Sequence, residues 1–459
     1  MRTTRFAIVL CVLLALAAVV FGFAASEPAI APIAPPPTAS FDPALVQRGA
    51  ELAAIGNCGV CHTAPGGREF EGGVALPTPF GTIYSTNITP DADTGIGAWS
   101  EAAFLRAMRN GVRRDGAYLY PAFPYDHFTL VTDDDDKALY DYLMTRRPVR
   151  SMPPDNALPF PLNVRLVMFG WNLLFLRQGP YRADSAHDDT FNRGAYLADG
   201  LGHCGACHTP RNVLGAEKVD GKFAGGEAEG WTAYALNASS PAPVPWNADT
   251  LFQYLHRGFE QEHGVARGPM ADVTGDLRSV PDNDVRAIAT YIAAHMPSTG
   301  TAQQAAQRPE LQTPRGTAVA AASADSQAMR AAGGNGDEGA AIYAATCAGC
   351  HEGPRAMPYG GIDLAFSSGV SGPSPTNLIN VVLYGLPAAA EARNPIMPGF
   401  ASALDDNQLV ALLRYLRGRF SGKGPWNEIE RSVHDARNGD GQRPAGPADS
   451  ARYNPAVPK

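Results

Sequence analysis

The sequence predicts a mainly α-helical chain of small tandem domains, and two repeated features lead to that prediction. The pattern Cys-x-x-Cys-His occurs three times, at 58–62, 204–208 and 347–351. A glycine sits in the predicted first helix ahead of each motif, at Gly49, Gly194 and Gly339. Self-similarity at this spacing indicates repeated units of about 100 residues, each large enough for its own small core.

Each repeat is expected to end in a helix with an acidic start. The starts are Thr132–Asp136, Pro281–Asp284 and Asp405–Gln408, and each helix carries a tyrosine at the same place, namely Tyr142, Tyr291 and Tyr415. Acidic residues in a first turn stabilise the helix N-terminus. We expect these tyrosines to pack where the first and last helices of each repeat cross.

The Cys-x-x-Cys-His spacing is the attachment signature of c-type haem. Two thiols bind the two vinyl groups of one porphyrin, and the adjacent imidazole binds the iron. The predicted attachment residues are Cys58, Cys61, Cys204, Cys207, Cys347 and Cys350, and the predicted proximal ligands are His62, His208 and His351. Zinc sites or thioredoxin-type pairs explain the pattern less well, because neither requires a histidine after every second cysteine. We therefore expect three covalently bound haem c groups.

The sixth iron ligands follow from a second shared register. A helix between the motif and the closing helix ends at Gly111, Gly258 or Gly385, and counting twelve residues on from the last two reaches Met270 and Met397. A thioether at that position gives His/Met coordination, which raises the reduction potential. The shared register favours ligation over a core-filling role for these methionines.

The first repeat departs from this pattern because the same count reaches Phe123, which cannot bind iron. His127, four residues on, is our candidate ligand and predicts a bis-His haem of lower potential. There are two alternatives. The iron is open or water-bound, or another methionine, Met108 or Met144, is its ligand. We expect His203 and His256 to have supporting or surface roles, and the remaining histidines, His187, His263, His295 and His434, to face solvent.

The N-terminus predicts export. Two arginines precede an apolar run from Phe6 to Ala25, followed by a proline-rich segment. Such a run directs the chain across a membrane with its positive end inside, and it fits a retained anchor and a cleaved signal equally well. The expected location is the periplasmic side of the bacterial inner membrane, anchored or peripheral.

These features divide the chain into seven segments. We predict a signal or anchor with a Pro-rich linker at 1–40, domains at 41–150, 186–300 and 333–435, an apolar interdomain segment at 151–185, a flexible linker at 301–332 and a disordered tail at 436–459. The apolar core of the interdomain segment, 159–178, is expected to form a helix packed between the first two domains, with docking to a membrane or a partner subunit as the alternative. A net charge of −8 argues against a nucleic-acid partner.

Several stretches carry a family resemblance. They are Pro79–Asp91 with Gly95–Trp99 after the first motif, Gly225-Gly226 with Gly230-Trp231 after the second, and Gly268–Met270. Over roughly 41–435 the chain resembles the triheme cytochrome c subunits of bacterial membrane-associated dehydrogenases, which serve alcohol, aldehyde, gluconate and molybdenum-hydroxylase-type enzymes. Phe123 departs from the methionine typical of the alcohol and gluconate branches. Tyr120–Phe128 and Pro358–Leu364 look similar to the cytochromes that accompany molybdopterin hydroxylases.

The resemblance implies three tandem class I cytochrome c-like domains, each wrapped around one covalent haem c. It also implies an electron relay from a partner dehydrogenase's catalytic subunit to membrane quinone or a downstream cytochrome or oxidase. No acid/base or nucleophile constellation is visible in the sequence, so we expect a non-catalytic subunit. The alternative is a haem enzyme or gas-binding protein that uses an open first haem, for which Phe123 is the motivation.

Overall fold

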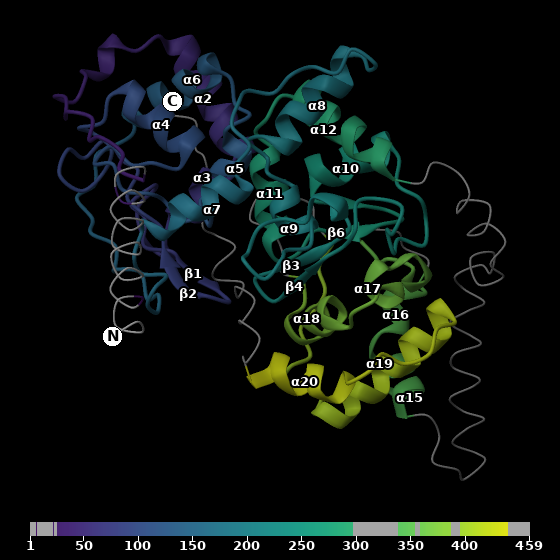
Figure 1. The fold of residues 1–459 in the computed structure, drawn as a ribbon. Helices are drawn as coiled ribbons and strands as arrows, with labels where there is room; N and C mark the ends of the chain where they lie inside the picture. Colours follow the sequence, from purple (N-terminus) through teal and green to yellow (C-terminus); the bar gives the residue numbers. More distant parts are fainter. Residues whose placement is uncertain are drawn as a thin grey trace, which may run out of the picture. The chain divides into compact units, whose positions relative to one another are not determined.

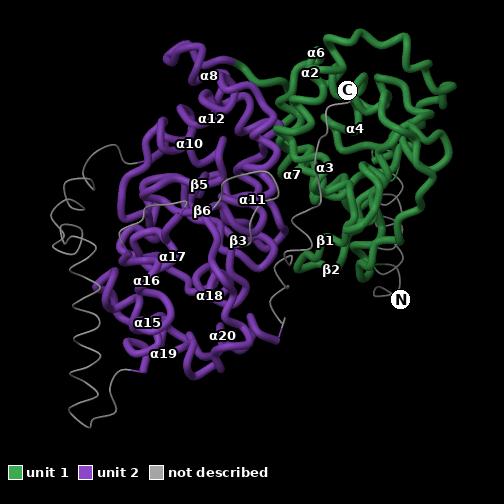
Figure 2. Tube along the Cα trace, turned by 180° about the vertical axis from the view of Figure 1, so that it is seen from behind, with its two compact units in different colours: residues 1–182 green, residues 183–459 purple. Residues whose placement is uncertain are grey.

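The computed structural model describes residues 25–296, 338–353, 359–386 and 395–438, together with positions 6 and 22. The described chain is mainly helical, with three two-stranded antiparallel sheets as its strand structure. It divides into two compact units, residues 1–182 and 183–459 (Figure 2). Among the described residues, no helix combines the length and the apolar character that crossing a membrane requires.

The first unit contains one short hairpin among its helices. Its elements are η1 (Thr38–Ser40), α2 (Pro43–Ile55), α3 (Cys58–His62), β1 (Ala75–Thr78), β2 (Gly81–Tyr84), α4 (Glu101–Asn110), α5 (Tyr125–Phe128), α6 (Asp133–Met144) and α7 (Val167–Phe175).

The second unit contains two further sets of helices. Its first part comprises α8 (Asp189–Asp199), α9 (Gly205–His208), η2 (Val219–Gly221), β3 (Gly226–Ala228), β4 (Trp231–Ala233), α10 (Ala248–Arg257), β5 (Phe259–Glu260), β6 (Gly264–Val265), α11 (Pro269–Leu277) and α12 (Asp282–His295). Its second part comprises α15 (Glu338–Thr346), α16 (Ala348–His351), η4 (Leu364–Phe366), α17 (Ser368–Ser371), α18 (Thr376–Tyr384), α19 (Asp406–Ser421) and α20 (Ile429–Asn438).

Three pairs of first and closing helices organise the fold, namely α2 with α6, α8 with α12, and α15 with α19 (Figure 1). The closing helices begin where the acidic starts predicted them. Thr132 caps α6 by accepting from the Asp135 backbone, and Asp405 caps α19 in a capping box with Gln408. The predicted first and last helices of each repeat are therefore present and packed together.

A glycine allows the two backbones of each pair to approach. A Cβ on Gly49, Gly194 or Gly339 would overlap the backbone carbonyl of Ala138, Ala287 or Ala411 on the closing helix. The next contact is in each case the β-carbon of a tyrosine, Tyr142, Tyr291 or Tyr415. The prediction that these tyrosines lie at the helix crossings is confirmed.

The helices that precede the ligand loops end at the predicted glycines. Gly111 and Gly258 adopt left-handed backbone after α4 and α10, with φ of 62° and 79°, and Gly385 follows α18 with φ of 70°. Glycine tolerates this conformation without the steric cost that a side chain brings. Each glycine therefore turns the chain sharply towards the segment that carries the candidate sixth ligand.

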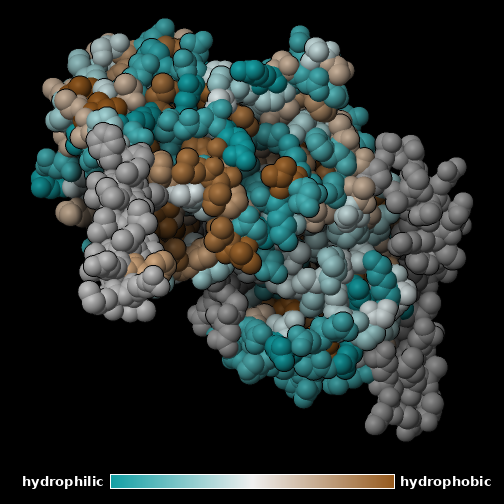
Figure 3. Space-filling model, in the orientation of Figure 1, coloured by the Kyte–Doolittle hydropathy of each residue, from teal (hydrophilic) through white to brown (hydrophobic). Residues whose placement is uncertain are grey.

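The apolar segment around Trp171 does form a helix, and that helix packs on the first unit's own core. Met168 and Trp171 of α7 are buried, whereas Leu173 and Leu174 are exposed. Figure 3 shows apolar side chains gathered on the surface of the first unit around this helix. α7 thus has one buried face and one exposed apolar face.

Several predicted segments fall outside the described residues. These are most of the N-terminal run, the linker 301–332 and most of the tail. Helix α20 extends to Asn438, three residues past the boundary that we predicted at 435.

Candidate haem sites

Each Cys-x-x-Cys-His motif lies on or at the start of a short helix, α3, α9 or α16. Residues three apart in a helix share a face, so the two thiols of each motif are presented on one side with the histidine next to the second. The six motif cysteines form no disulfide. This placement is what attachment of a porphyrin by two thioether bonds requires.

All three motif histidines are oriented in the same way. The Nδ1 atom lies 2.7 Å from the Thr86 carbonyl oxygen in His62, 2.7 Å from that of Tyr234 in His208, and 2.8 Å from that of Ile362 in His351. A carbonyl can only accept, so each Nδ1 carries the proton and donates it. The Nε2 atom of each ring is then the unprotonated nitrogen, as a metal-binding imidazole needs.

Burial favours the neutral form of two of these rings. It lowers the pKa of His62 and of His208, although the backbone hydrogen bond of each opposes that shift. A neutral imidazole is the form that binds iron.

The cysteines do not resemble redox-active or zinc-binding thiols. Burial raises the pKa of Cys204 to about 12 and also raises those of Cys207 and Cys347. Reactive thiols have a lowered pKa instead. In the part of the chain that the structure describes, no three His, Cys, Asp or Glu side chains gather into a metal-binding group.

Phe123 and Met270 occupy corresponding positions in their loops. The Ala266 amide donates to the Gly258 carbonyl at 2.8 Å, and in the first unit the Leu119 amide donates to Gly111 at 2.7 Å. In both units the donor stands eight residues after the glycine, and Met270 or Phe123 follows four residues later. The two loops therefore run in the same register.

Met397 lies beside the end of α18. Its amide and carbonyl pair with those of Leu386, with N···O distances of 3.0 and 2.8 Å. Its half-buried side chain packs against the core of the second unit's C-terminal part. Met270 is also half-buried, near the start of α11.

His127 lies on α5, a single turn whose position is fixed by α7. The buried Tyr125 donates its hydroxyl to Asn172 Oδ1 at 2.7 Å and packs edge-on against Trp171 at 5.9 Å. The Phe123 and Phe128 rings, on either side of His127 in sequence, contact each other at 5.1 Å. His62 and His127 are the only histidines in residues 1–182, so His127 is the only histidine of this unit left to serve as a sixth ligand.

The other histidines have partners of their own. His187 contacts Asp184 at 3.1 Å, His256 contacts Asp282 at 3.4 Å, and His434 lies 3.9 Å from Asp406. One expectation was wrong, because His263 is buried. It lies 2.6 Å from a Glu260 carboxylate oxygen and stacks on Trp246 at 3.5 Å, so a carboxylate and an aromatic ring hold it away from solvent.

The strand beside His208 of the second motif is hydrogen-bonded to the C-terminal part of the same unit. Asn377 of α18 accepts from the Thr232 amide and donates to the Thr232 carbonyl, each at 2.8 Å. Asn380 donates to the Gly230 carbonyl at 3.0 Å. Thr232 lies two residues before Tyr234, whose carbonyl accepts from His208. The strand β4 therefore links the second candidate haem site to α18, which leads into the third.

A half-buried arginine at this junction suits an anionic group. Arg267 donates from Nε to the Gly385 carbonyl at 3.3 Å, and burial lowers its pKa. Among the described residues its Nη2 atom is buried and has no hydrogen-bond partner. A buried donor of this kind is costly unless an acceptor satisfies it. A haem brings two carboxylate side chains, so the residues present fit this group.

Three histidines anchored alike, six thiols in attachment spacing and a largely helical fold define a c-type cytochrome. The family model described as "Cytochrome C oxidase, cbb3-type, subunit III" matches residues 334–416.

Relatives cover far more of the chain. It is 36% identical over 425 residues to the fructose dehydrogenase cytochrome subunit of Gluconobacter japonicus, covering 90% of this chain and 86% of the relative. It is 39% identical over 397 residues to the gluconate 2-dehydrogenase cytochrome c subunit of Pantoea cypripedii, covering 82% of this chain and 85% of the relative. The chain therefore belongs to the family of cytochrome c subunits of dehydrogenases, as its motifs predicted.

A third relative is much longer. The chain is 45% identical over 416 residues, or 90% of its length, to a subunit of the nicotinate dehydrogenase of Pseudomonas putida. The match covers 33% of that relative, so the chain spans about a third of its length.

Two parts of the site were not visible in the sequence, namely the β4–α18 contact and the role of Arg267. Asn377 and Asn380 lie one helical turn apart, but an asparagine pair on a helix gives no signal of its partner. The conspicuous feature near Arg267 is the Gly-Pro-Met sequence that follows it.

Proposed function

We propose that this chain carries three covalently attached haem c groups in three tandem class I cytochrome c-like domains and relays electrons for a partner dehydrogenase. The observation that carries the proposal is the threefold recurrence of one arrangement, in which Nδ1 of His62, His208 and His351 is bonded to a backbone carbonyl. Each haem iron, when bound, takes up and gives up one electron. The residues named above hold and orient each group.

The proposed sixth ligands differ between domains. Met270 and Met397 would give His/Met coordination, and the shared loop register supports Met270 in the place where the first domain has Phe123. His127 would complete the first iron, supported by its position on a turn that Tyr125 and Asn172 hold in place. A bis-His first haem would have a lower potential than the other two.

The second and third haem sites would exchange electrons across the β4–α18 contact. Asn377 and Asn380 fix the strand that leads to the His208 partner carbonyl, so the two sites would be held at a constant separation. Cytochromes tune transfer chiefly by fixing cofactors in position and setting their potentials.

The partners follow from the relatives. We infer a dehydrogenase catalytic subunit as donor and membrane quinone or a downstream cytochrome or oxidase as acceptor, at the periplasmic side of the inner membrane. The apolar run from Phe6 to Ala25 supports membrane association, either as an anchor or as an export signal. The 45% identity to a nicotinate dehydrogenase subunit favours a molybdopterin hydroxylase-type partner. The alternative haem enzyme is not favoured, because two of the three relatives described above are cytochrome subunits of dehydrogenases and the third is a dehydrogenase subunit.

Electron paramagnetic resonance of the oxidised haem-loaded protein tests the proposal, together with a haem count per chain. We expect three low-spin signals, one of which becomes high-spin in His127→Ala but not in the control variant. His187→Ala is the matched control, because His187 is exposed and pairs with Asp184. A high-spin haem in the unaltered protein would instead mean an open first iron. Fewer than three haems per chain would refute the triheme assignment.

A further inference from the structure

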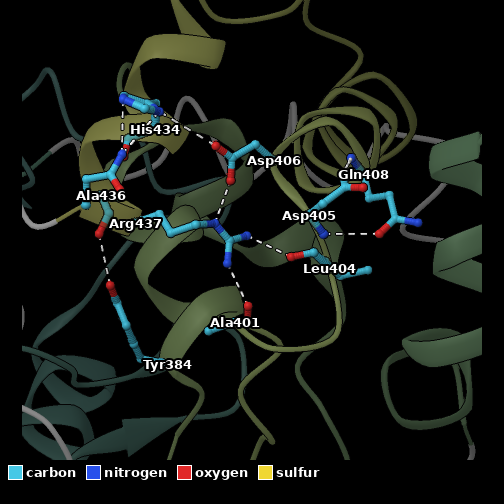
Figure 4. Close-up of polar contacts among 10 residues, drawn as sticks. Tyr384, Ala401, Leu404, Asp405, Asp406, Gln408, His434, Ala436 and Arg437 are labelled. Carbon is cyan, nitrogen blue, oxygen red and sulfur yellow. Dashed lines mark hydrogen bonds and ion pairs between the residues drawn. The ribbon is translucent and has the colours of Figure 1, made fainter.

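Helix α20 follows the closing helix of the C-terminal part and packs back onto it. Ile429 and Val433 are 1% and 0% exposed and belong to the same apolar core as α18 and α19. Two residues near the end of α20, Ala436 and Arg437, make polar contacts with the chain on either side of Met397 (Figure 4).

Arg437 uses all three of its side-chain nitrogens. Nη1 donates to the Ala401 carbonyl at 2.6 Å, Nη2 donates to the Leu404 carbonyl at 2.8 Å, and Nε pairs with Asp406 Oδ1 at 2.5 Å. Asp406 is the first residue of α19, so this ion pair links α20 to the start of α19. Arg437 thus fastens the loop between Met397 and α19 at two backbone carbonyls.

The other side of the Met397 segment is fastened through Tyr384. This residue ends α18 and donates its hydroxyl to the Ala436 carbonyl at 2.9 Å. Two residues on, Leu386 pairs with Met397 through both backbone bonds. The chain after Met397 returns to α18, because the Phe400 and Ala401 amides donate to the Val382 and Leu383 carbonyls at 2.9 and 3.1 Å.

We propose that α20 is a positioning element for the sixth ligand of the third haem. Through Arg437 and the Tyr384–Ala436 hydrogen bond, α20 holds the chain on both sides of Met397. The thioether can then bind the iron with little further loss of conformational entropy. An iron–thioether bond competes with opening of the loop that carries it, and a loop held at both ends has less conformational entropy to lose on binding. This inference rests on the proposed ligation by Met397.

The test uses the full haem-loaded chain and three variants. Arg437→Ala removes the fastening beyond Met397, and Tyr384→Phe removes only the hydroxyl on the other flank. Arg431→Ala is the matched control, because Arg431 lies on the same helix, is 69% exposed and pairs with Glu428. The readouts are the near-red charge-transfer absorption of thioether-ligated ferric haem and the potential of the third haem by spectroelectrochemical titration.

We expect Arg437→Ala to lose the third haem's share of that absorption and to lower its potential, Tyr384→Phe to show a smaller change in the same direction, and Arg431→Ala to show none. Unchanged absorption and potential in folded Arg437→Ala would overturn the proposal, as would an equal loss in Arg431→Ala. If Arg437→Ala does not fold, Tyr384→Phe decides alone, and no change in that variant overturns the proposal.

A fourth variant, Met397→Leu, separates this inference from the function on which it rests. If Met397→Leu leaves the absorption unchanged, Met397 is not a ligand and the proposed coordination fails. If Met397→Leu removes the third haem's share whereas Arg437→Ala and Tyr384→Phe do not, only the positioning role of α20 fails.

Discussion

Replacing Gly339 by alanine should destabilise the C-terminal helix pair. The new β-carbon would overlap the Ala411 carbonyl and lie 2.9 Å from the Tyr415 β-carbon, so the helices α15 and α19 must move apart. Both contacts are rigid backbone or β-carbon atoms, which cannot swing away. Overpacking of this kind costs about 3 kcal/mol at the upper end of its usual range.

A gain in helix propensity offsets part of that loss. Alanine is favoured over glycine inside a helix by about 1 kcal/mol, which leaves a net destabilisation of about 2 kcal/mol. Gly418 provides the matched control, because it lies inside α19 of the same pair and a Cβ there meets nothing within 4 Å. Gly418→Ala should therefore stabilise by about 0.5–1 kcal/mol.

Thermal unfolding of the full haem-loaded protein, followed by far-ultraviolet circular dichroism and by the haem absorption, measures both variants. We expect the transition of the C-terminal part to move down in Gly339→Ala and up in Gly418→Ala. Equal shifts in both variants would refute the reasoning, because they would mean that the repeated glycines serve helix propensity alone and not close approach.

Three further predictions concern the second unit. Burial raises the pKa of Asp276 to about 7, whereas the unfolded value is 3.8. Between these two pH values the folded chain holds a proton that the unfolded chain has lost. The contribution of Asp276 to the stability of the folded chain is therefore greatest below pH 3.8 and falls as the pH rises towards 7. Asp276→Asn should therefore leave the free energy of unfolding unchanged at pH 4 and raise it at pH 8, by at most about 4 kcal/mol. Denaturant titrations at the two pH values measure this difference. An equal effect at both pH values would contradict a raised pKa of Asp276. Asn377→Ala breaks two hydrogen bonds to the Thr232 backbone and should weaken the contact between the two parts of the unit by about 2 kcal/mol. Calorimetry should then resolve separate unfolding of the two parts. One undivided transition at the original temperature would count against the contact. Arg267→Gln should lower the potential of an adjacent haem by removing a half-buried positive charge, whereas Arg431→Gln, a control at a 69% exposed arginine, should not. Identical titrations for both variants would argue against an anionic group at Arg267.

The local features of the repeats were readable from the sequence because they depend on short-range rules. Acidic caps, left-handed glycines and the three-residue cysteine spacing each act within a few residues. The equivalence of Gly49, Gly194 and Gly339 was also readable, because the chain repeats its own pattern and the copies align without any structure. The first and closing helices of each repeat were found where these signals predicted them.

Contacts between elements were not readable in the same way. His263 carries no sequence mark of burial, and it is buried because Glu260 and Trp246 fold around it. The segment around Trp171 reads as apolar in sequence, but Asn172 within it bonds to Tyr125 and Asn110, which lie 47 and 62 residues earlier in the chain. Which of its faces is buried depends on those distant partners.

By itself the sequence predicted the attachment chemistry and the proximal histidines, and it determined the family to which the chain belongs and where its first and closing helices lie, because each depends on residue identity at fixed short spacing. The tertiary structure decided which carbonyl orients each imidazole, how β4 meets α18, and that α20 holds the flanks of Met397. Those contacts join residues far apart in the chain, and their partners are backbone atoms that every residue carries, so no pattern of side chains announces them.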